Sequence, residues 1–234
     1  MNVEKAKSKS IRSFVRRGGR ITPAQRQALE SCWPKWGIDF GSGVVELPPG
    51  FEALKLEIGF GNGDALIEMA AADPRSLYLG IEVHLPGVGR CLNRIESQGL
   101  DNVRLISHDA IEVMETMLVP GSLSRVLLFF PDPWHKKRHH KRRIVNHHFR
   151  DLVYRGLEPG GAVHVATDWE DYAQWIAAEF LGDARFDNQG DARGYCEKPA
   201  YRPRTRFERR GLALGHGVWD LVFTRQALPL ADVR

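Results

Sequence analysis

Apolar residues recur in short blocks through the central part of the chain, and each block is followed by a segment in which apolar residues have helical spacing. The blocks predict strands over residues 53–58, 77–81, 103–107, 124–130 and 162–166. The segments between them predict helices over residues 64–72, 86–98, 110–118, 144–156 and 169–181. This alternation is typical of an α/β fold, with a parallel sheet and helices on both faces.

The last part of the chain departs from the alternation. Residues 185–188 and 218–225 have strand patterns, but no long helix is predicted between them. We therefore expect a terminal antiparallel pair at one side of the sheet. Residues 124–130 form the most apolar block, which favours a central position for that strand, because a central strand is buried on both faces.

The first part of the chain predicts little regular structure. Thr22 is followed by Pro23 and by Gln25, which is the capping-box pattern of a helix start, and this short helix is expected to end near Cys32. Glycine and proline are frequent in residues 37–53, which indicates a loop. We expect a basic N-terminal arm with one short helix over residues 1–45 and a single domain over residues 46–234.

Composition narrows the class of protein. The chain has 234 residues, of which 43% are hydrophobic and 26% charged, as in ordinary globular proteins. No apolar run approaches the roughly 18–20 residues of a membrane span, and the basic N-terminus lacks the apolar core of a secretory signal. The three cysteines form no CxxC pair and are odd in number, so a reducing cytoplasm is the simplest setting.

Charge is distributed unevenly behind a formal net value of +4. Residues 1–20 carry +6, residues 135–143 carry +6 and residues 201–210 carry +4, so the remainder of the chain carries −12. Clustered cations are typical of proteins that bind a polyanion, because each neutralised phosphate releases counterions. For any single block, an exposed solvated loop is an equally good interpretation.

The first predicted strand runs into a glycine-rich turn that contains Gly59, Gly61 and Gly63. Glycines allow a sharp turn and a close approach of the backbone to a ligand. The dinucleotide pattern GxGxxG would require glycine where Asp64 stands, and Glu57 before the turn would repel a pyrophosphate. A nicotinamide dehydrogenase is therefore disfavoured, and a cationic or neutral ligand is favoured.

Acidic residues stand at or just beyond the carboxyl ends of successive predicted strands, namely Glu57, Glu82, Asp109 and Asp132. Open α/β sheets bind ligands at this edge, and an acid at the end of the second strand is placed to accept both hydroxyls of a ribose. Asp64 and Asp109 could each simply cap a helix. Four acids in register favour a ligand-binding edge over four unrelated caps.

Motifs along the chain resemble those of one known family. In order they are RSFVRRGGRITPAQ, LEIGFGNGD, GIEVH, FFPDPWHKKRHHKRRIV, ATDWEDY and RTRFERRG. They resemble the bacterial tRNA (guanine-N7)-methyltransferases of the TrmB type, over residues 12–225. The resemblance implies a Rossmann-like class I methyltransferase fold, with a mostly parallel seven-stranded sheet, a terminal antiparallel strand and helices on both faces.

The resemblance also implies a cofactor, S-adenosyl-L-methionine. The residues that match the family's cofactor positions are Glu57, Gly59, Gly61, Gly63, Glu82, Asp109 and Asp132. Glu82 would bind the ribose hydroxyls, Asp109 would lie near the adenine, and Glu57 would lie near the methionine part. An acidic lining suits a ligand that carries a sulfonium and an ammonium group.

Asp132, in the sequence Pro131-Asp132-Pro133-Trp134, matches the family's catalytic acid. Guanine N7 has a free lone pair and no proton, so no general base is needed there. We hypothesise that Asp132 accepts from the N1–H or 2-amino edge of the base and offsets the developing positive charge. The same segment resembles the (Asp/Asn)-Pro-Pro-aromatic motif of amino methyltransferases, and the prolines could merely shape a loop.

Two further sets of residues are implied to bind the RNA. The positions that match substrate contacts are Lys136, Asp168, Thr205, Arg206, Phe207 and Glu208. The positions that match the RNA-contacting run are Arg138, His139, His140, Lys141, Arg142 and Arg143. Helix caps are the alternative for Asp168 and for the Thr205–Glu208 pair. Trp134 would stack on an extruded base or lie in the core.

The expected function is transfer of a methyl group to N7 of a guanine in tRNA, at guanosine 46 of the variable loop as the family implies. The expected partner is tRNA, with no membrane and no metal, since no acid lies between Asp132 and Asp151 among the histidines of that region. A monomer is expected and a homodimer is left open. The alternatives are an amino methyltransferase and an RNA-binding protein that does not catalyse.

Overall fold

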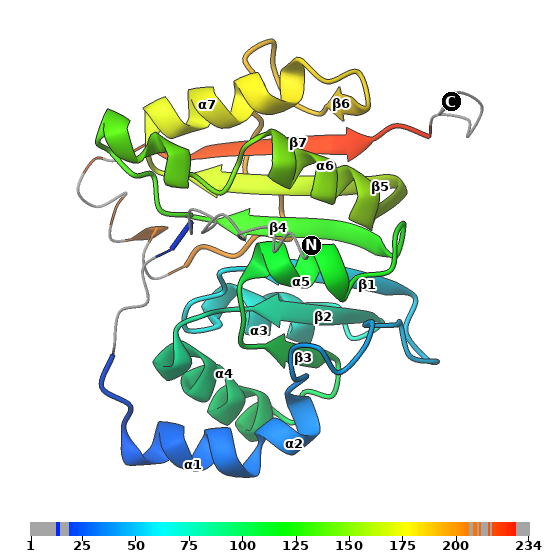
Figure 1. Ribbon diagram of the computed structural model, residues 1–234, viewed down its shortest axis with the longest axis vertical. Coiled ribbons are helices and arrows are strands. Elements are labelled where there is room, and N and C mark those ends of the chain that lie inside the picture. Colours follow the sequence, from blue (N-terminus) through cyan, green and yellow to red (C-terminus); the bar gives the residue numbers. More distant parts are fainter. Residues whose placement is uncertain are drawn as a thin grey trace, which may run out of the picture.

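A seven-stranded sheet forms the centre of the computed structural model, which describes residues 13–14, 19–205, 208–209, 211, 215 and 217–227 (Figure 1). The strands are β1 (Ala53–Ile58), β2 (Ser76–Ile81), β3 (Val103–Ile106), β4 (Leu123–Phe129), β5 (Leu157–Thr167), β6 (Phe186–Asn188) and β7 (Trp219–Arg225). The helices are α1 (Pro23–Ser31), α2 (Trp33–Trp36), α3 (Asp64–Ala72), α4 (Leu85–Gln98), α5 (Ala110–Thr116), the 3-10 helix η1 (Lys137–Arg142), α6 (His147–Gly156) and α7 (Glu170–Leu181).

The strand order is β3-β2-β1-β4-β5-β7-β6. All neighbours from β3 to β5 pair in parallel, and β7 is antiparallel to both β5 and β6. The predicted fold is confirmed, including the central position of the most apolar strand, β4. Because the chain reverses its direction of travel across the sheet between β1 and β4, a crevice opens beyond their carboxyl ends.

Helices cover both faces of the sheet and bury two apolar clusters. On one face, Val113 of α5, Phe149 of α6 and Ile176 of α7 belong to the larger cluster. On the other face, Leu66 of α3 and Leu92 of α4 belong to the second cluster, which α1 and α2 join. The helix-strand alternation therefore matches the predicted layers. The domain boundary at residue 45 stays a prediction.

Several element boundaries differ from the predictions for local reasons. The helix predicted from residue 144 begins at His147, because the side chain of Asn146 accepts a hydrogen bond from the Phe149 amide at 3.1 Å. The helix η1 was not predicted, since its cationic sequence has no apolar periodicity. The strand β5 begins at Leu157 instead of Ala162 and pairs there with Leu123 before a register shift.

No helix in the described ranges combines the length and the apolarity that crossing a membrane requires.

The contact between α4 and the glycine turn generates a prediction about stability. A Cβ atom on Gly87 would lie 2.2 Å from the backbone oxygen of Gly61, so Gly87→Ala must displace one of the two backbones. We expect the free energy of unfolding, measured by denaturant titration, to fall by about 1–3 kcal/mol. The control is Gly182→Ala, whose Cβ would be 3.6 Å from its nearest neighbour, and we expect a change within about 0.5 kcal/mol. Equal stability of the two variants would contradict the close contact.

Candidate active site

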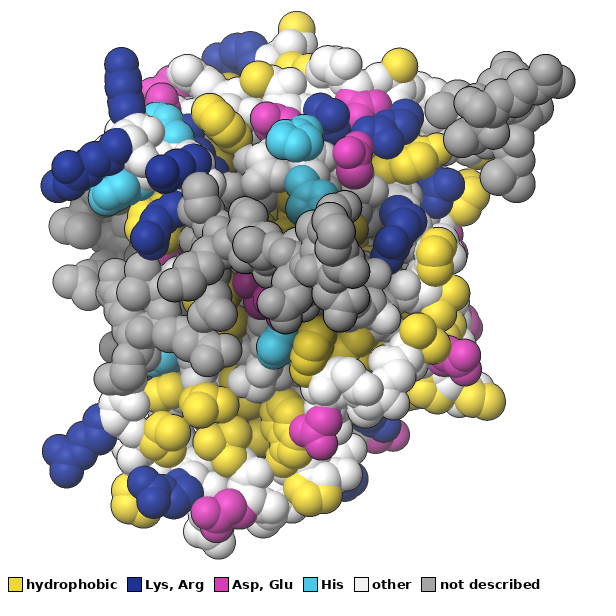
Figure 2. Space-filling model, in the orientation of Figure 1, with side chains coloured by type: hydrophobic (Ala, Val, Ile, Leu, Met, Phe, Trp, Pro, Cys, Tyr) yellow, Lys and Arg dark blue, Asp and Glu magenta, His cyan; other side chains and the backbone are white. Residues whose placement is uncertain are grey.

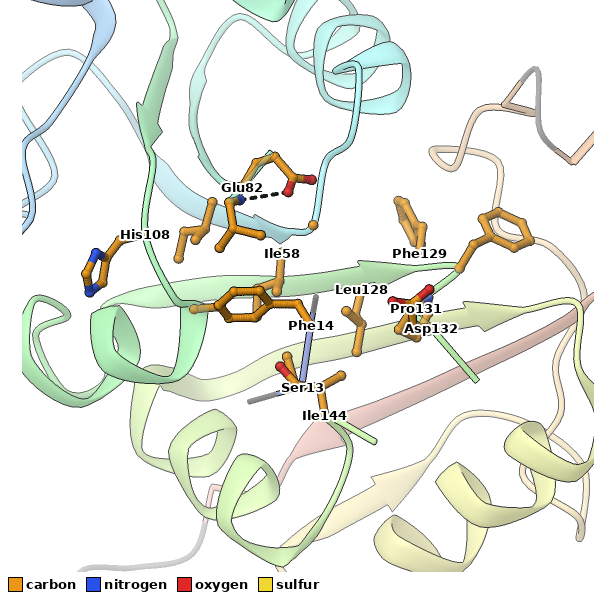
Figure 3. A pocket seen from close by; sticks show the side chains of 15 residues that line it. Ser13, Phe14, Ile58, Glu82, His108, Leu128, Phe129, Pro131, Asp132 and Ile144 are labelled. Carbon is orange, nitrogen blue, oxygen red and sulfur yellow. Dashed lines mark hydrogen bonds between the residues drawn. The ribbon is translucent and has the colours of Figure 1, made fainter. Parts of the chain in front are cut away.

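A pocket of about 240 Å³ lies beyond the carboxyl ends of β1, β2 and β4. Its walls include Glu82 at the end of β2 and Asp132 after β4. Figure 3 shows these two side chains on different sides of the pocket. The predicted ligand edge of the sheet thus contains a cavity, and acids from two different strands reach it.

The glycine-rich turn forms the part of this edge that follows β1. Gly59, Gly61 and Gly63 have φ angles of 71°, 59° and 76°, a region that other residues rarely adopt. A Cβ atom on Gly63 would also lie 2.4 Å from the Sγ atom of Cys91. Glycine is required at this turn both for its backbone conformation and for its packing against α4.

The Glu82 carboxylate is held between the glycine turn and the start of α4. Its Oε2 atom accepts from the Gly61 amide at 2.8 Å, and its Oε1 atom accepts from the amides of Val83 and His84 at 2.7 and 2.9 Å. The three donors fix the orientation of the carboxylate. A carboxylate has about four lone-pair sites, so with three amides bound Glu82 retains about one site to accept from a ligand hydroxyl.

Glu57 is a buried acid with an incomplete set of partners. It is 3% exposed, and its Oε2 atom has no hydrogen-bond partner among the described residues. It lines a second pocket of about 210 Å³, next to the first, together with Gly61, Phe129 and Thr205. Burial, and then the negative charge of Glu82, raise the pKa of Glu57 to about 8. A bound cation would compensate this carboxylate, and an anionic pyrophosphate would not.

The structure places the three remaining predicted acids, Asp109, Asp132 and Asp168, in different settings. Asp109 caps α5 by accepting from the Ile111 amide at 2.9 Å, so the capping interpretation is observed, and the adjacent Ala110 lines the main pocket. Asp132 is exposed at the pocket rim. Asp168 follows β5 and is not the cap of α7, because the N-cap residue is Trp169.

The predicted RNA-contacting run forms η1 and the residue after it. Figure 2 shows Lys and Arg side chains gathered over η1, at the upper left of the molecule. Lys136, Arg138 and Lys141 are exposed, and the guanidinium of Arg142 lies 4.9 Å from the centre of the Trp134 ring. Arg138 donates to His139 at 3.3 Å, and His140 is half-buried at a ring distance of 6.0 Å from Trp175.

Arg143 differs from the rest of the run. Its side chain is only 1% exposed, and its Nε atom donates to the Pro133 carbonyl at 3.0 Å. A second guanidinium nitrogen forms an ion pair with Asp171 on α7. Of the six residues predicted to contact RNA, Arg143 alone is buried.

The Thr205–Glu208 segment is divided between the pocket and the interior. Thr205 lines the pocket of Glu57, and its hydroxyl accepts from the Glu208 amide at 3.1 Å, which is half of the capping box. The Glu208 carboxylate is buried and accepts two bonds from Arg202, at 2.7 and 2.9 Å. Arg202 also binds Asp220 of β7, so part of the third basic block is neutralised in the interior. The predicted contacts Arg206 and Phe207 lie outside the described residues.

Some pocket residues were missed from the sequence. Ser13, Phe14 and His108 line the main pocket, as do Phe129 and Phe130 at the end of β4. Ser13 and Phe14 belong to the motif RSFVRRGGRITPAQ, which was a usable signal, whereas nothing in the sequence distinguished His108. Among the residues described, no group of three or more histidine, cysteine or acidic side chains could hold a metal ion.

Comparison with known proteins agrees with this geometry. Residues 52–221 match the model of a family described as putative methyltransferases. A tRNA (guanine-N(7)-)-methyltransferase of Halorhodospira halophila is 52% identical over 92% of this chain and 95% of its own length. A protein of the same name from Cronobacter sakazakii is 50% identical over 92% of this chain and 91% of its own.

The chain belongs to the tRNA (guanine-N7)-methyltransferase family. This confirms the resemblance recognised in the motifs and the enzyme class that it implied. Solved structures with lower sequence identity to this methyltransferase are informative about its fold only. The 16S rRNA methyltransferase KamB has a TM-score of 0.55 at 16% identity, over 80% of this chain and 97% of its own. The [4+2]-cyclase SpnF has a TM-score of 0.51 at 14% identity, over 86% and 80%, so the fold by itself does not specify the reaction.

The buried Glu57 gives this methyltransferase a defined pH dependence of stability. Its folded pKa lies above the unfolded value of 4.5, so its contribution to stability is complete below pH 4.5 and is lost as the pH rises through about 8. Glu57→Gln removes the titrating group. We expect the variant to match the wild type near pH 4.5 and to be more stable at pH 8.5, by on the order of 2–4 kcal/mol.

Denaturant titrations of the cofactor-free protein between pH 4.5 and 8.5 measure this difference. Glu52→Gln is the control, since Glu52 is exposed and its carboxylate pairs with the exposed Arg75. Parallel pH curves for wild type and Glu57→Gln would show that Glu57 does not titrate in this way.

Proposed function

We propose that this protein transfers a methyl group from S-adenosyl-L-methionine to N7 of a guanine in tRNA, at guanosine 46 of the variable loop. The observation that carries the proposal is the buried Glu57 carboxylate, which lines the pocket of the glycine turn with one oxygen unpaired. Relatives about 50% identical over most of the chain are named for this reaction, which supports the same substrate here.

The residues of the two adjoining pockets fit S-adenosyl-L-methionine in charge and donor type. That molecule, when bound, supplies the methyl group. Glu82, already oriented by three amides, would accept from the ribose hydroxyls. Glu57 would pair with the cationic methionine part, with Gly59, Gly61 and Gly63 allowing close approach of the backbone. Asp109, at the same edge, would lie near the adenine.

Asp132 would act on the guanine. Its position at the pocket rim, directly after β4, lets an extruded base enter beside it. The carboxylate would accept from the N1–H or 2-amino edge, which orients the base and leaves N7 free. Because methylation at N7 makes the purine cationic, the same carboxylate would stabilise the charge that develops. No proton has to leave N7, so Asp132 need not act as a base.

The exposed cations near this rim would hold the RNA. Among them Arg138 and Lys141, together with the half-buried Arg142, are suited to phosphate contacts. Lys136 and Asp168 would bind the substrate closer to the base. Residues 1–45 would serve as a basic arm, and of its described residues Ser13 and Phe14 line the pocket. The partner is tRNA, and the compartment we propose is the cytoplasm, where tRNA is modified in bacteria.

Product mapping tests this proposal directly. Unmodified tRNA would be incubated with the protein and methyl-labelled S-adenosyl-L-methionine, and the labelled nucleoside and its position would then be determined. We expect 7-methylguanosine at position 46. Label on an exocyclic amine would indicate the amino methyltransferase suggested by the Asp-Pro-aromatic segment. Binding of tRNA without any label would indicate a non-catalytic RNA-binding protein.

Substitution of Asp132 separates its two proposed roles. Asp132→Asn keeps an acceptor but loses the charge, and Asp132→Ala loses both. We expect kcat to fall by about 100–1,000-fold in the alanine variant and less in the asparagine variant, while the affinity for S-adenosyl-L-methionine stays within about threefold. Asp101→Asn, an exposed acid after α4, is the control. Unchanged turnover in Asp132→Ala would remove Asp132 from the mechanism.

A further inference from the structure

The loop that carries Asp132 has an unusual backbone. Phe130 and Trp134, at its two ends, have φ angles of 53° and 48°, and no other described residue except glycine has a positive φ. Bulky aromatic residues rarely adopt this conformation, and Phe130 is further restricted because a proline follows it. A backbone of this kind persists only where surrounding contacts hold it.

Contacts hold the loop at both of its ends. At the first end, the Phe130 amide donates to the Ala166 carbonyl of β5 at 2.7 Å. At the second end, the Trp134 indole donates to the Ser13 carbonyl at 3.1 Å, and the Arg142 guanidinium lies over the Trp134 ring. These contacts involve the ends of the loop and do not include its middle, around Asp132 and Pro133.

The middle of the loop is held by Arg143. Its Nε atom donates to the carbonyl of Pro133, the residue next to Asp132, at 3.0 Å. Its guanidinium also pairs with Asp171 of α7 and lies 4.8 Å and 5.1 Å from the ring centres of Tyr172 and Trp175 on the same helix. One guanidinium therefore connects the loop over residues 130–134, the catalytic loop, to α7.

The chain after Arg143 is fixed to α7 as well. The Trp175 indole donates to the Val145 carbonyl at 2.7 Å, and the Val145 amide donates to the Tyr172 hydroxyl at 3.4 Å. Ile144, between Arg143 and Val145, lines the same pocket as Asp132 (Figure 3). Arg143 is thus part of a continuous set of contacts between the pocket and α7.

Burial excludes Arg143 from a surface role. A guanidinium that is 1% exposed cannot reach a phosphate without leaving its partners, and burying an arginine is costly unless its interactions are specific. The planar fork of arginine can donate in two directions at once, which a lysine ammonium on a flexible stem does less well. The interactions that compensate this burial all involve the catalytic loop or α7.

We propose that Arg143 is a positioning residue that sets the placement of Asp132, and that it is not an RNA contact. Its effect is exerted through the Pro133 carbonyl. Because η1 joins the catalytic loop to Arg143 along the chain, Arg143 also fixes the base of the exposed cationic surface. The inference rests on the proposed function for the role of Asp132 itself.

Arg143→Lys is the first test, because it keeps the charge but not the two-directional fork. We expect kcat to fall by about 10–100-fold, as a small misplacement of a catalytic group produces, with the dissociation constant for tRNA and its salt dependence unchanged. Arg138→Gln, an exposed neighbour, should instead reduce the slope of log affinity against log salt by about 0.7–0.9. A matching loss of slope in Arg143→Lys would overturn the proposal.

Two further variants address folding. Arg150→Gln removes a half-buried arginine on α6 that pairs with Asp183 at 2.8 Å, away from the catalytic loop, and should leave kcat unchanged. Equal kcat losses in Arg150→Gln and Arg143→Lys would overturn the positioning role.

If Arg143→Lys does not fold, Asp171→Asn tests the positioning role in its place. Asp171 is 61% exposed, so its substitution leaves the buried core intact. A lower kcat with an unchanged salt slope in Asp171→Asn supports the proposal, and an unchanged kcat overturns it.

The outcomes separate this inference from the proposed function. If the wild type methylates an atom other than guanine N7, the proposed function fails, whereas the kcat comparison between variants still tests the placement of the loop. If the wild type produces 7-methylguanosine and Arg143→Lys behaves like Arg138→Gln, the function stands and the inference about Arg143 fails.

Discussion

Everything at the active site depends on the reversal of strand order between β1 and β4. Parallel pairing of β1 with both β2 and β4 brings three carboxyl ends to one edge, so side chains that are distant in sequence share one pocket. The glycine turn after β1 then passes next to α4, and the close approach of Gly87 to the backbone oxygen of Gly61 leaves no room for a side chain at Gly87. The pocket is therefore a consequence of topology, and the acids are placed by it.

Charge in this protein is arranged in opposite ways inside and outside. Within the adjoining pockets, the negative charge of Glu82 disfavours the ionised form of Glu57, and the unpaired oxygen of Glu57 suits a cationic ligand. Outside, η1 presents cations to solvent beside the same rim. A small net charge for the whole chain conceals this separation, in which each region matches a ligand of opposite sign.

Two buried arginines connect the loops around the pocket to the sheet and its helices. Arg143 joins the loop of Asp132 to α7, and Arg202 joins Glu208 to Asp220 of β7. Each guanidinium is 1% exposed and donates in more than one direction. Such pairs hold irregular backbone in place where regular hydrogen-bond ladders cannot. Both loops contain proline, and the loop of Asp132 also has strained φ angles at Phe130 and Trp134.

The local pattern of the sequence determined most of the secondary structure, the sheet type and the acids at its edge. The strand over residues 53–58 and the helix over residues 64–72 have the predicted bounds, because a short apolar block and helical spacing are local properties. Only the tertiary structure decided which charged residues are buried. Arg143 and Arg202 resemble their exposed neighbours in sequence, and their partners Asp171 and Asp220 lie 28 and 18 residues away. Burial of a charge depends on partners brought together by folding, and no local pattern encodes that.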